Sequence, residues 1–160
     1  MLVPEPQTRI SERALTVWKI SGAIQSMVIW LFGAGVIALA VRFDWSSWII
    51  IVDLVICSLH SYFFILLLPK LRWKRWRYEV RDQEIELQRG VFIIKRTLIP
   101  MVRVQHVDTQ QGPLLRKYQL STVIISTAAT VHEIPALVMV EAEELRNSIS
   151  RLARVADEDV

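Results

Sequence analysis

Hydrophobic positions dominate the first seventy residues, where two long apolar segments follow one another. Residues 20–41 contain no charged residue, and residues 45–68 contain a single acid, Asp53. At about 1.5 Å per residue, each segment spans about 33–36 Å as a helix, enough to cross a hydrocarbon core of about 30 Å. Residues 38–40 (Ala-Leu-Ala) resemble a signal-peptidase site, but the apolar run exceeds the usual length of about 7–15 residues. The pattern therefore predicts a transmembrane hairpin over residues 20–69.

Basic residues flank this hairpin and set its expected orientation. Three basic residues occur in the N-terminal segment, residues 1–19, and five of the chain's 19 Lys and Arg residues lie within residues 70–77. The turn between the spans has Arg42 balanced by Asp44. Because basic flanks stay in the cytoplasm, we expect both termini on the cytoplasmic side of the membrane.

The basic segment after the second span, residues 70–77, is the first candidate site and is expected to form a short stalk. Anionic headgroups attract such clusters by about 1 kcal/mol per Lys or Arg, and tryptophan rings favour headgroup depth. This cluster accounts for the net charge of +3 without nucleic acid. Two roles are open, topology setting alone or headgroup binding. The candidate residues are Lys70, Arg72, Trp73, Lys74, Arg75, Trp76 and Arg77.

Polar residues inside the spans form the second candidate site. They are Asp53, His60, Gln25 and Ser26. A carboxylate at this depth costs several kcal/mol unless it is protonated, paired or hydrated. An antiparallel hairpin with level ends places His60 opposite Gln25 and Ser26, and Asp53 opposite Gly33. Three roles are open for Asp53: contact with a partner protein, a neutral acid bonded within the hairpin, or proton and substrate handling.

Residues 78–155 read as several short strands followed by one helix. Period-2 alternation and β-branched residues predict the strands, and a short helical turn is expected within residues 114–120. The expected strands cover residues 78–81, 84–88, 91–99, 101–110, 122–127 and 130–134. Apolar residues spaced by three and four then predict an amphipathic helix with Ala142, Leu145, Ile149 and Leu152 on one face. Residues 156–160 read as a frayed acidic tail. Six or seven short antiparallel strands closed by this helix give an α+β fold.

Three segments carry a resemblance to a known family. They read Ile-Pro-Met-Val-Arg-Val-Gln-His-Val at residues 99–107, Gln-Gly-Pro-Leu-Leu-Arg at residues 111–116 and Ile-Ser-Thr-Ala at residues 125–128. In this order and spacing they resemble the membrane-associated bacterial pleckstrin-homology-like (PH-like) domain family, over about residues 78–154. The two-span N-terminal anchor is typical of its small members. Gln119 and Ala129 stand where the family pattern has glycine.

The resemblance implies the fold of the whole chain. The chain is then an α+β membrane protein, with a two-helix transmembrane hairpin followed by a PH-like, partly open antiparallel β-barrel capped by a C-terminal helix. The resemblance also implies that small members act beside a larger membrane protein with several PH-like domains, and it attaches no enzymatic activity. A homo-oligomer is an alternative assembly.

The segment over residues 101–110 supplies the third candidate site. On a strand, Arg103 and Gln105 share one face. They either hold the turn over residues 111–116 against the sheet, or form an exposed platform for a partner or an anionic headgroup. The platform consists of Arg103, Gln105, Arg116 and Lys117.

Charge in the first hairpin loop argues against one familiar activity. Phosphoinositide binding of the eukaryotic pleckstrin kind needs basic residues around that loop. Here Asp82 is flanked by Glu79, Glu84 and Glu86. We therefore expect any lipid contact to involve residues 70–77 instead.

The sequence offers little support for a catalytic or metal-binding function. The sequence has no G-x-S-x-G, H-E-x-x-H or phosphate-binding glycine loop. Cys57 and His60 have metal-like spacing but lack further soft ligands, and a single cysteine excludes an intrachain disulfide. We expect no enzyme, metal, cofactor or nucleic acid.

The preferred function is a membrane-anchored, non-enzymatic module that docks onto a partner membrane protein at the cytoplasmic face. One alternative is a subunit of a lipid or small-molecule transport or export assembly that uses Asp53 and His60. The other is an anionic-lipid sensor.

Overall fold

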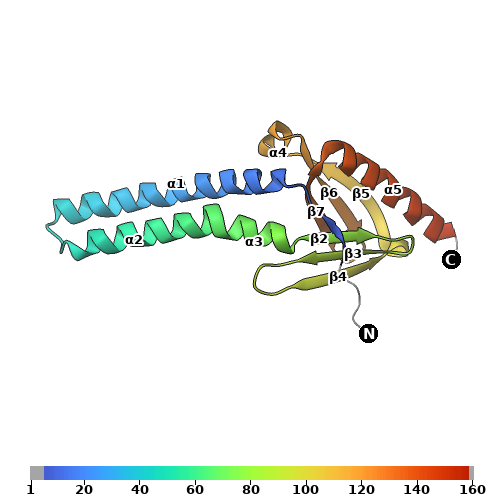
Figure 1. Cartoon of the computed structure of the whole chain (residues 1–160), viewed down its shortest axis with the longest axis horizontal. Helices are drawn as coiled ribbons and strands as arrows, with labels where there is room; N and C mark the ends of the chain where they lie inside the picture. The colour runs from blue at the N-terminus through green and yellow to red at the C-terminus, as the bar shows by residue number, and fades with distance from the viewer. Residues whose placement is uncertain (1–5, 159–160) are drawn as a thin grey trace. The chain divides into compact units, whose positions relative to one another are not determined.

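The structure, a computed structural model, describes residues 6–158 of the chain (Figure 1). These residues divide into two compact units. One unit is the hairpin, residues 15–71. The other unit combines the N-terminal segment up to Ala14 with everything from Arg72 onward. The sequence segment before the hairpin therefore folds with the domain after it.

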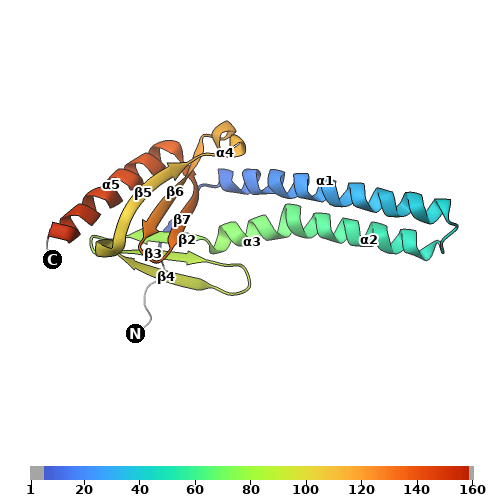
Figure 2. The same ribbon diagram turned by 180° about the vertical axis from the view of Figure 1, so that it is seen from behind.

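The hairpin has two long helical arms. The first is α1 (Arg13–Arg42), and the second joins α2 (Trp48–Tyr62), the π-helical turn η1 (Phe63–Leu67) and α3 (Leu68–Arg75). Figures 1 and 2 show α1 and α2 side by side. The most apolar 18-residue windows have mean hydropathies of 2.1 and 2.3, with only 17% and 6% of their residues buried. Both helices are therefore long and apolar enough to cross a membrane, and most of their apolar side chains are exposed.

A glycine brings the two arms into close contact. A Cβ atom on Gly22 would overlap the backbone carbonyl oxygen of Phe64. Phe64 belongs to the π-helical turn, which accommodates one more residue than an α-helical turn. Small residues allow helix backbones to approach closely in this way. Gly35, on the same helix, has open space around its Cβ position.

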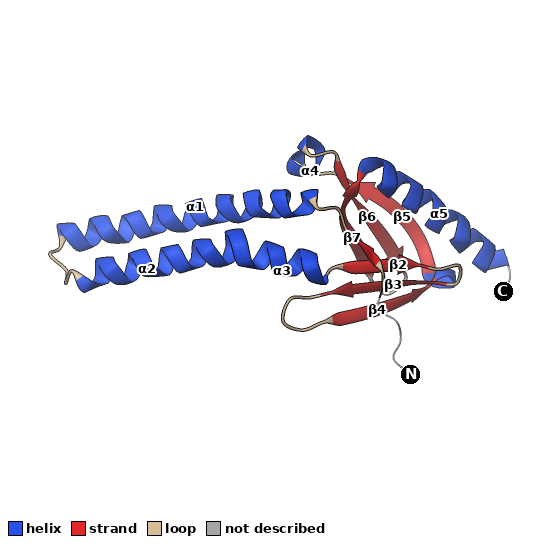
Figure 3. Ribbon diagram, viewed as in Figure 1, coloured by secondary structure: helices blue, strands red, loops and turns tan. Residues whose placement is uncertain are grey.

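The domain contains seven strands in two antiparallel sheets (Figure 3). The first sheet has the order β1-β2-β3-β4 and the second the order β5-β6-β7. The strand bounds are β1 Thr8–Arg9, β2 Arg77–Val80, β3 Glu84–Arg89, β4 Lys95–Pro100, β5 Val104–Gln110, β6 Leu120–Thr127 and β7 Val131–Val138. A 3₁₀ turn, η2 (Met101–Arg103), and a short helix, α4 (Pro113–Lys117), complete the connections before the final helix, α5 (Met139–Glu158). The predicted α+β fold is confirmed.

Strand β1 was not predicted, because two residues carry no periodic signal. It pairs with β2 through Thr8 opposite Tyr78 and Arg9 opposite Arg77. The Trp73 indole N–H donates a hydrogen bond to the Ile10 carbonyl, at 3.3 Å. The Arg9 guanidinium lies 5.7 Å from the centre of the Trp73 ring, at cation–π distance. The segments that flank the hairpin are therefore joined in one sheet.

Helix α5 covers β5 and β6 with its apolar face (Figure 2). Ala142 and Ile149 are fully buried, and Leu145 and Leu152 are partly buried. The predicted apolar stripe is confirmed. The buried side chains beneath it come from both sheets and include Ile85, Met101, Leu120, Val123, Ile125, Ile134 and Leu137.

Several local predictions need correction. Strand β4 begins at Lys95, so residues 91–94 form a loop. Residues 101–103 form a 3₁₀ turn between β4, which ends at Pro100, and β5. Residues 70–75 continue the helix and Arg77 begins β2, so there is no separate stalk. The acidic tail is helical through Glu158, and its last two residues lie outside the described part of the chain.

Gln119 adopts a left-handed backbone conformation, with φ of 54°. The family pattern has glycine here, and glycine populates this region without a Cβ penalty. The Gln119 N–H donates to the Arg116 carbonyl, and its own carbonyl accepts from the Met139 N–H, each at 3.1 Å. Ala129, the other departure, has no positive φ.

Replacing Ile149 with alanine should destabilise the domain by about 2–5 kcal/mol, because the truncation leaves a cavity beneath α5. Thermal unfolding of the full-length protein in mild detergent measures this loss. Val155→Ala, at a side chain that is 52% exposed on the same helix, should stay within about 0.5 kcal/mol. Equal effects of the two variants would contradict the packing described here.

Replacing Gly22 with alanine should weaken the packing of the hairpin arms by about 1–3 kcal/mol, because the added methyl meets backbone rather than a movable side chain. Gly35→Ala is the matched control and should not weaken it, since its Cβ position is open. Melting temperatures of both variants in the same detergent compare them. A neutral Gly22→Ala would show that the two arms do not approach closely at this point.

Candidate functional site

One open seam of the domain lies between β4 and β5. Strand β4 is one edge of the first sheet and β5 is one edge of the second, and the two strands are not hydrogen-bonded to each other. A groove of about 520 Å³ lies along this seam, between β4 and the β6–β7 turn. Edge strands present unpaired backbone N–H and C=O groups, which favour the addition of another strand.

The groove is lined by apolar and small polar side chains. They belong to Thr97, Leu98, Ile99, Pro100, Val102, Arg103, Gln105, Thr127, Ala128, Ala129, Thr130 and His132. Leu98 and Val102 are 54% and 49% exposed, and nearby Val131 is 56% exposed. The buried Thr97 hydroxyl has no hydrogen-bond partner. Two of the three segments that carry the family resemblance meet in this groove.

His132 on β7 contributes the only histidine among the residues that line the seam groove, and its side chain is 9% exposed. Burial lowers the pKa of His132, and the positive charges of Arg89 and Lys95 lower it further. The neutral imidazole is therefore favoured in the folded domain. From the sequence alone His132 reads as a surface or turn residue, because its burial depends on the approach of the two sheets.

The predicted platform is divided between two places. Arg103 and Gln105 line the seam groove, whereas Arg116 lies in a small groove with Gln111 and Glu143. Lys117 is exposed on α4, as is Arg116. Strand β5, seven residues long, separates the two pairs by about 20 Å at about 3.3 Å per residue. Arg103 also lies in a 3₁₀ turn rather than a strand, so the four residues do not form one surface.

The turn before β6 is held by Gln111 and Ser121 and not by Arg103 and Gln105. The Gln111 side-chain amide donates to the Leu120 carbonyl at 3.0 Å, and the Ser121 hydroxyl donates to the Gln110 carbonyl at 3.3 Å. The polar bridge predicted for Arg103 and Gln105 is thus made by Gln111 and Ser121.

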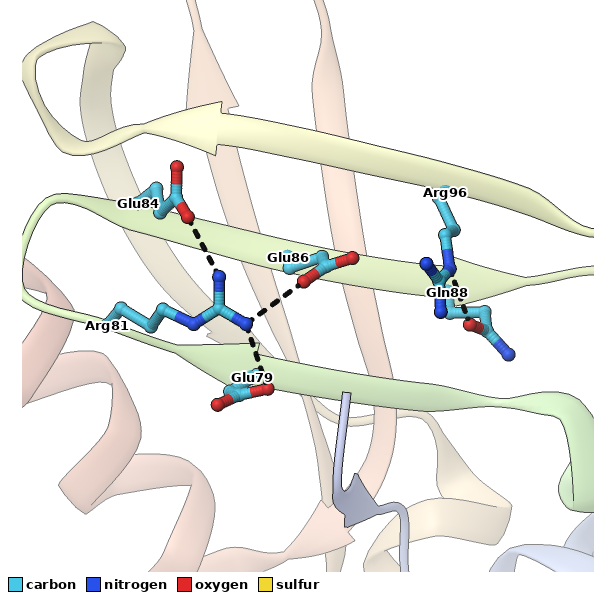
Figure 4. Close-up of polar contacts among 6 residues, drawn as sticks. All are labelled: Glu79, Arg81, Glu84, Glu86, Gln88 and Arg96. Atoms are coloured by element: carbon cyan, nitrogen blue, oxygen red, sulfur yellow. Dashed lines mark hydrogen bonds and ion pairs between the residues drawn. The ribbon is translucent and has the colours of Figure 1, made fainter. Parts of the chain in front are cut away.

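The β2–β3 hairpin carries an acidic network (Figure 4). Arg81 contacts Glu84 at 2.9 Å and both Glu79 and Glu86 at 3.3 Å. These three carboxylates raise the pKa of Arg81. One cation among three acids leaves this end of the first sheet negative, which disfavours an anionic headgroup there, in agreement with the sequence-based argument.

The juxtamembrane candidates split into exposed and buried members. Lys70, Arg72, Lys74 and Arg75 are exposed. Trp73 is partly buried against the N-terminal segment, Arg77 lies in β2, and Trp76 is 4% exposed. Burial keeps the Trp76 ring from the headgroup depth expected for it, because the ring is part of the domain core.

Inside the hairpin, Asp53 faces the first helix. Its Oδ2 atom lies 2.9 Å from the Cβ position of Gly33, and the Cys57 sulfur lies at the same distance. The predicted register for Asp53 and Gly33 is confirmed. The carboxylate is therefore directed between the two arms and not outward.

The predicted pairing of His60 with Gln25 and Ser26 is not formed. Gln25 is exposed, and the Ser26 hydroxyl and His60 Nδ1 are both buried without hydrogen-bond partners. The His60 ring instead stacks on Phe64, with 4.3 Å between centroids. The interhelical hydrogen bond observed here runs from the Trp30 indole N–H to the Ser61 hydroxyl, at 2.9 Å.

A second groove, of about 850 Å³, lies between β2 and α5. The buried Tyr78 hydroxyl donates to Glu141 at 3.4 Å. Burial raises the pKa of Tyr78, and the Glu141 charge raises it further. This contact ties β2 to α5. No group of three or more potential metal ligands occurs within residues 6–158.

The fold and the hairpin together define a class, a membrane-anchored PH-like protein. A family model described as "Bacterial PH domain" matches residues 22–153, and the chain belongs to this family. The chain is similar to the UPF0699 transmembrane protein YdbS of Bacillus subtilis (strain 168), with 53% identity over 156 residues that cover 98% of both proteins.

A second relative is much longer. The UPF0699 transmembrane protein YdbT of the same organism is 27% identical over 83 residues, which are 49% of this chain and 17% of YdbT. No solved structure matches the chain. The membrane location and the PH-like fold are thus supported by the family and by the name of the first relative.

His132 should make the domain sensitive to mild acid. Since its pKa is lowered in the folded state, the unfolded chain binds a proton first as the pH falls below the ordinary value of about 6.5. Stability is therefore present above that pH and is lost as the pH falls toward the lowered value. Melting temperatures between pH 7 and pH 5 should fall more for the native protein than for His132→Gln. Parallel curves would contradict this assignment.

Proposed function

We propose that this protein is a membrane-anchored PH-like interaction module that docks onto a larger membrane protein at the cytoplasmic face. Its role is that of a non-catalytic scaffold or accessory subunit. The observation that carries the proposal is the open seam between β4 and β5, with its exposed apolar side chains.

The seam fits a protein segment better than a small ligand. Leu98 and Val102 are about half exposed at its rim, and a free strand edge runs alongside. An extended segment that pairs with this edge would cover these side chains and satisfy the edge backbone. The groove is open rather than enclosed, and apolar surface of this kind in a folded domain favours an interface.

The long relative supports the class of partner. The region of YdbT related to this chain is 17% of that protein, so a related region also occurs within a larger transmembrane protein. A larger protein with PH-like regions offers sheets of the same architecture, and such sheets have edges of the same kind. We infer that the seam receives a strand from a PH-like region of this larger partner.

The anchor makes a modest interface sufficient. Confinement to one membrane raises the effective concentration of the two partners, and contacts in the membrane and beneath it then act together. The basic residues on both flanks of the hairpin favour a cytoplasmic domain under the positive-inside rule, which supports this part of the proposal.

The transport alternative has less support. It requires Asp53 and His60 to line a path, but the first lies against Gly33 and the second stacks on Phe64. A proton- or substrate-handling role for Asp53 would need a water-filled cavity beside it. The contact with α1 instead favours a role in packing the hairpin.

Leu98→Lys should abolish docking. A charged residue that the partner buries in place of an apolar one costs about 2 kcal/mol or more, which lowers affinity by more than tenfold. The test purifies the full-length protein in mild detergent and identifies the partner by its PH-like sequence. Val155→Lys is the matched control, because Val155 is 52% exposed and Leu98 is 54% exposed. If both variants retain the partner, or if both lose it, docking at the seam is refuted.

A further inference from the structure

The loop between β3 and β4, residues 90–94, exposes three large apolar side chains. Phe92 is 82% exposed, Ile93 is 84% exposed and Ile94 is 46% exposed. We call residues 90–94 the apolar loop. Contiguous exposed apolar side chains at a loop tip are unfavourable in water and indicate a surface that another phase or molecule covers.

Gly90 fixes the shape of this loop. Its φ is +122°, and a Cβ atom there would overlap the carbonyl oxygen of Ile93. Only glycine combines this backbone conformation with so close an approach. The loop is therefore a tight structure that projects Phe92 and Ile93.

The strand register places the apolar loop at the end of the first sheet where β2 begins. Arg77 pairs with Gln88, two residues before Gly90, and helix α3 ends at Arg75. Figure 3 shows the loop at the end of the sheet where β2 begins. At about 3.3 Å per residue, the loop begins within about 10 Å of that point. The end of the first sheet that carries the apolar loop is therefore the end to which helix α3 is joined.

Charge is segregated along the same sheet. The end with the apolar loop carries Arg77, Arg89, Lys95 and Arg96. The opposite end carries Glu79, Asp82, Glu84 and Glu86, with Arg81 among them. The apolar loop itself contains no acid. An anionic surface is therefore favoured at one end and disfavoured at the other.

We propose that the apolar loop inserts into the anionic lipid surface of the membrane that the hairpin spans, as a second and separate membrane contact. Phe92 and Ile93 enter the boundary between headgroups and acyl chains, and Lys95 and Arg96 lie at headgroup level. Apolar side chains flanked by basic residues bind interfaces through this combination. The inference depends on the membrane anchor and not on docking at the seam.

A lipid occupant accounts for three features that a protein occupant does not require together. The loop begins close to the membrane exit, its flanks are uniformly basic, and the sheet becomes acidic away from the lipid. Insertion would also hold the domain in one orientation, which leaves the acidic β2–β3 turn in the aqueous phase.

The test uses the full-length protein with Cys57→Ser, which removes its only cysteine. Ile93→Cys and, separately, Asp82→Cys are labelled with an environment-sensitive fluorophore in nanodiscs that contain anionic lipid and no other protein. We expect blue-shifted emission at position 93 and quenching by nitroxide lipids. Position 82, at the other end of the same sheet, should show neither.

Water-like emission at position 93 in these nanodiscs would overturn the proposal. Protection at position 93 that needs other membrane proteins would identify a protein contact and overturn it equally. A second variant adds Phe92→Ser to the labelled Ile93→Cys protein and should reduce the quenching. Because Phe92 is 82% exposed, the melting temperature of the Phe92→Ser variant should not change. This control separates lost insertion from lost folding.

Discussion

The pairing of β1 with β2 is the constraint on which the rest of the structure depends. These strands are the segments that enter and leave the hairpin, and Thr8 lies opposite Tyr78. Trp73 reinforces the junction through its bond to the Ile10 carbonyl. A hairpin whose two ends belong to one sheet must enter and leave the bilayer on the same side. The sheet therefore requires the two flanks of the hairpin to lie on one side of a bilayer, while the charge rule is needed to say which side.

The same register gives the domain distinct ends and sides. One end of the first sheet is basic and apolar, and the other is acidic around Arg81. The seam between β4 and β5 runs along the side, with Leu98 at its rim. A protein tethered so closely to the bilayer is able to engage lipid with its end and another protein with its side at the same time. The two surfaces share β4 but use different residues of it.

The features with long periodic patterns could be predicted from the sequence, and the others depended on spatial relations. The apolar spans and the α5 stripe through Ile149 gave clear signals, since each extends over many residues. Strand β1 could not be predicted from the sequence, because two residues are too few to show an alternating pattern. A tryptophan beside a basic cluster suggests a membrane interface, yet Trp76 is buried. The four platform residues do not share one groove, because Arg103 lies in η2 before β5 and Arg116 lies in α4 after it. The sequence pattern does not reveal the apolar loop, because Val, Phe and Ile at residues 91–94 favour a strand as strongly as the residues of β4 that follow.

The left-handed residue Gln119 has a consequence for how the domain opens. Its backbone N–H is bonded to α4 and its carbonyl to the first residue of α5, although this conformation costs a non-glycine residue about 1–2 kcal/mol. A single residue thus connects a short helix, a central strand and the capping helix. Fraying of the first turn of α5 would break the Met139–Gln119 hydrogen bond and leave Gln119 held in this conformation by its bond to Arg116 alone.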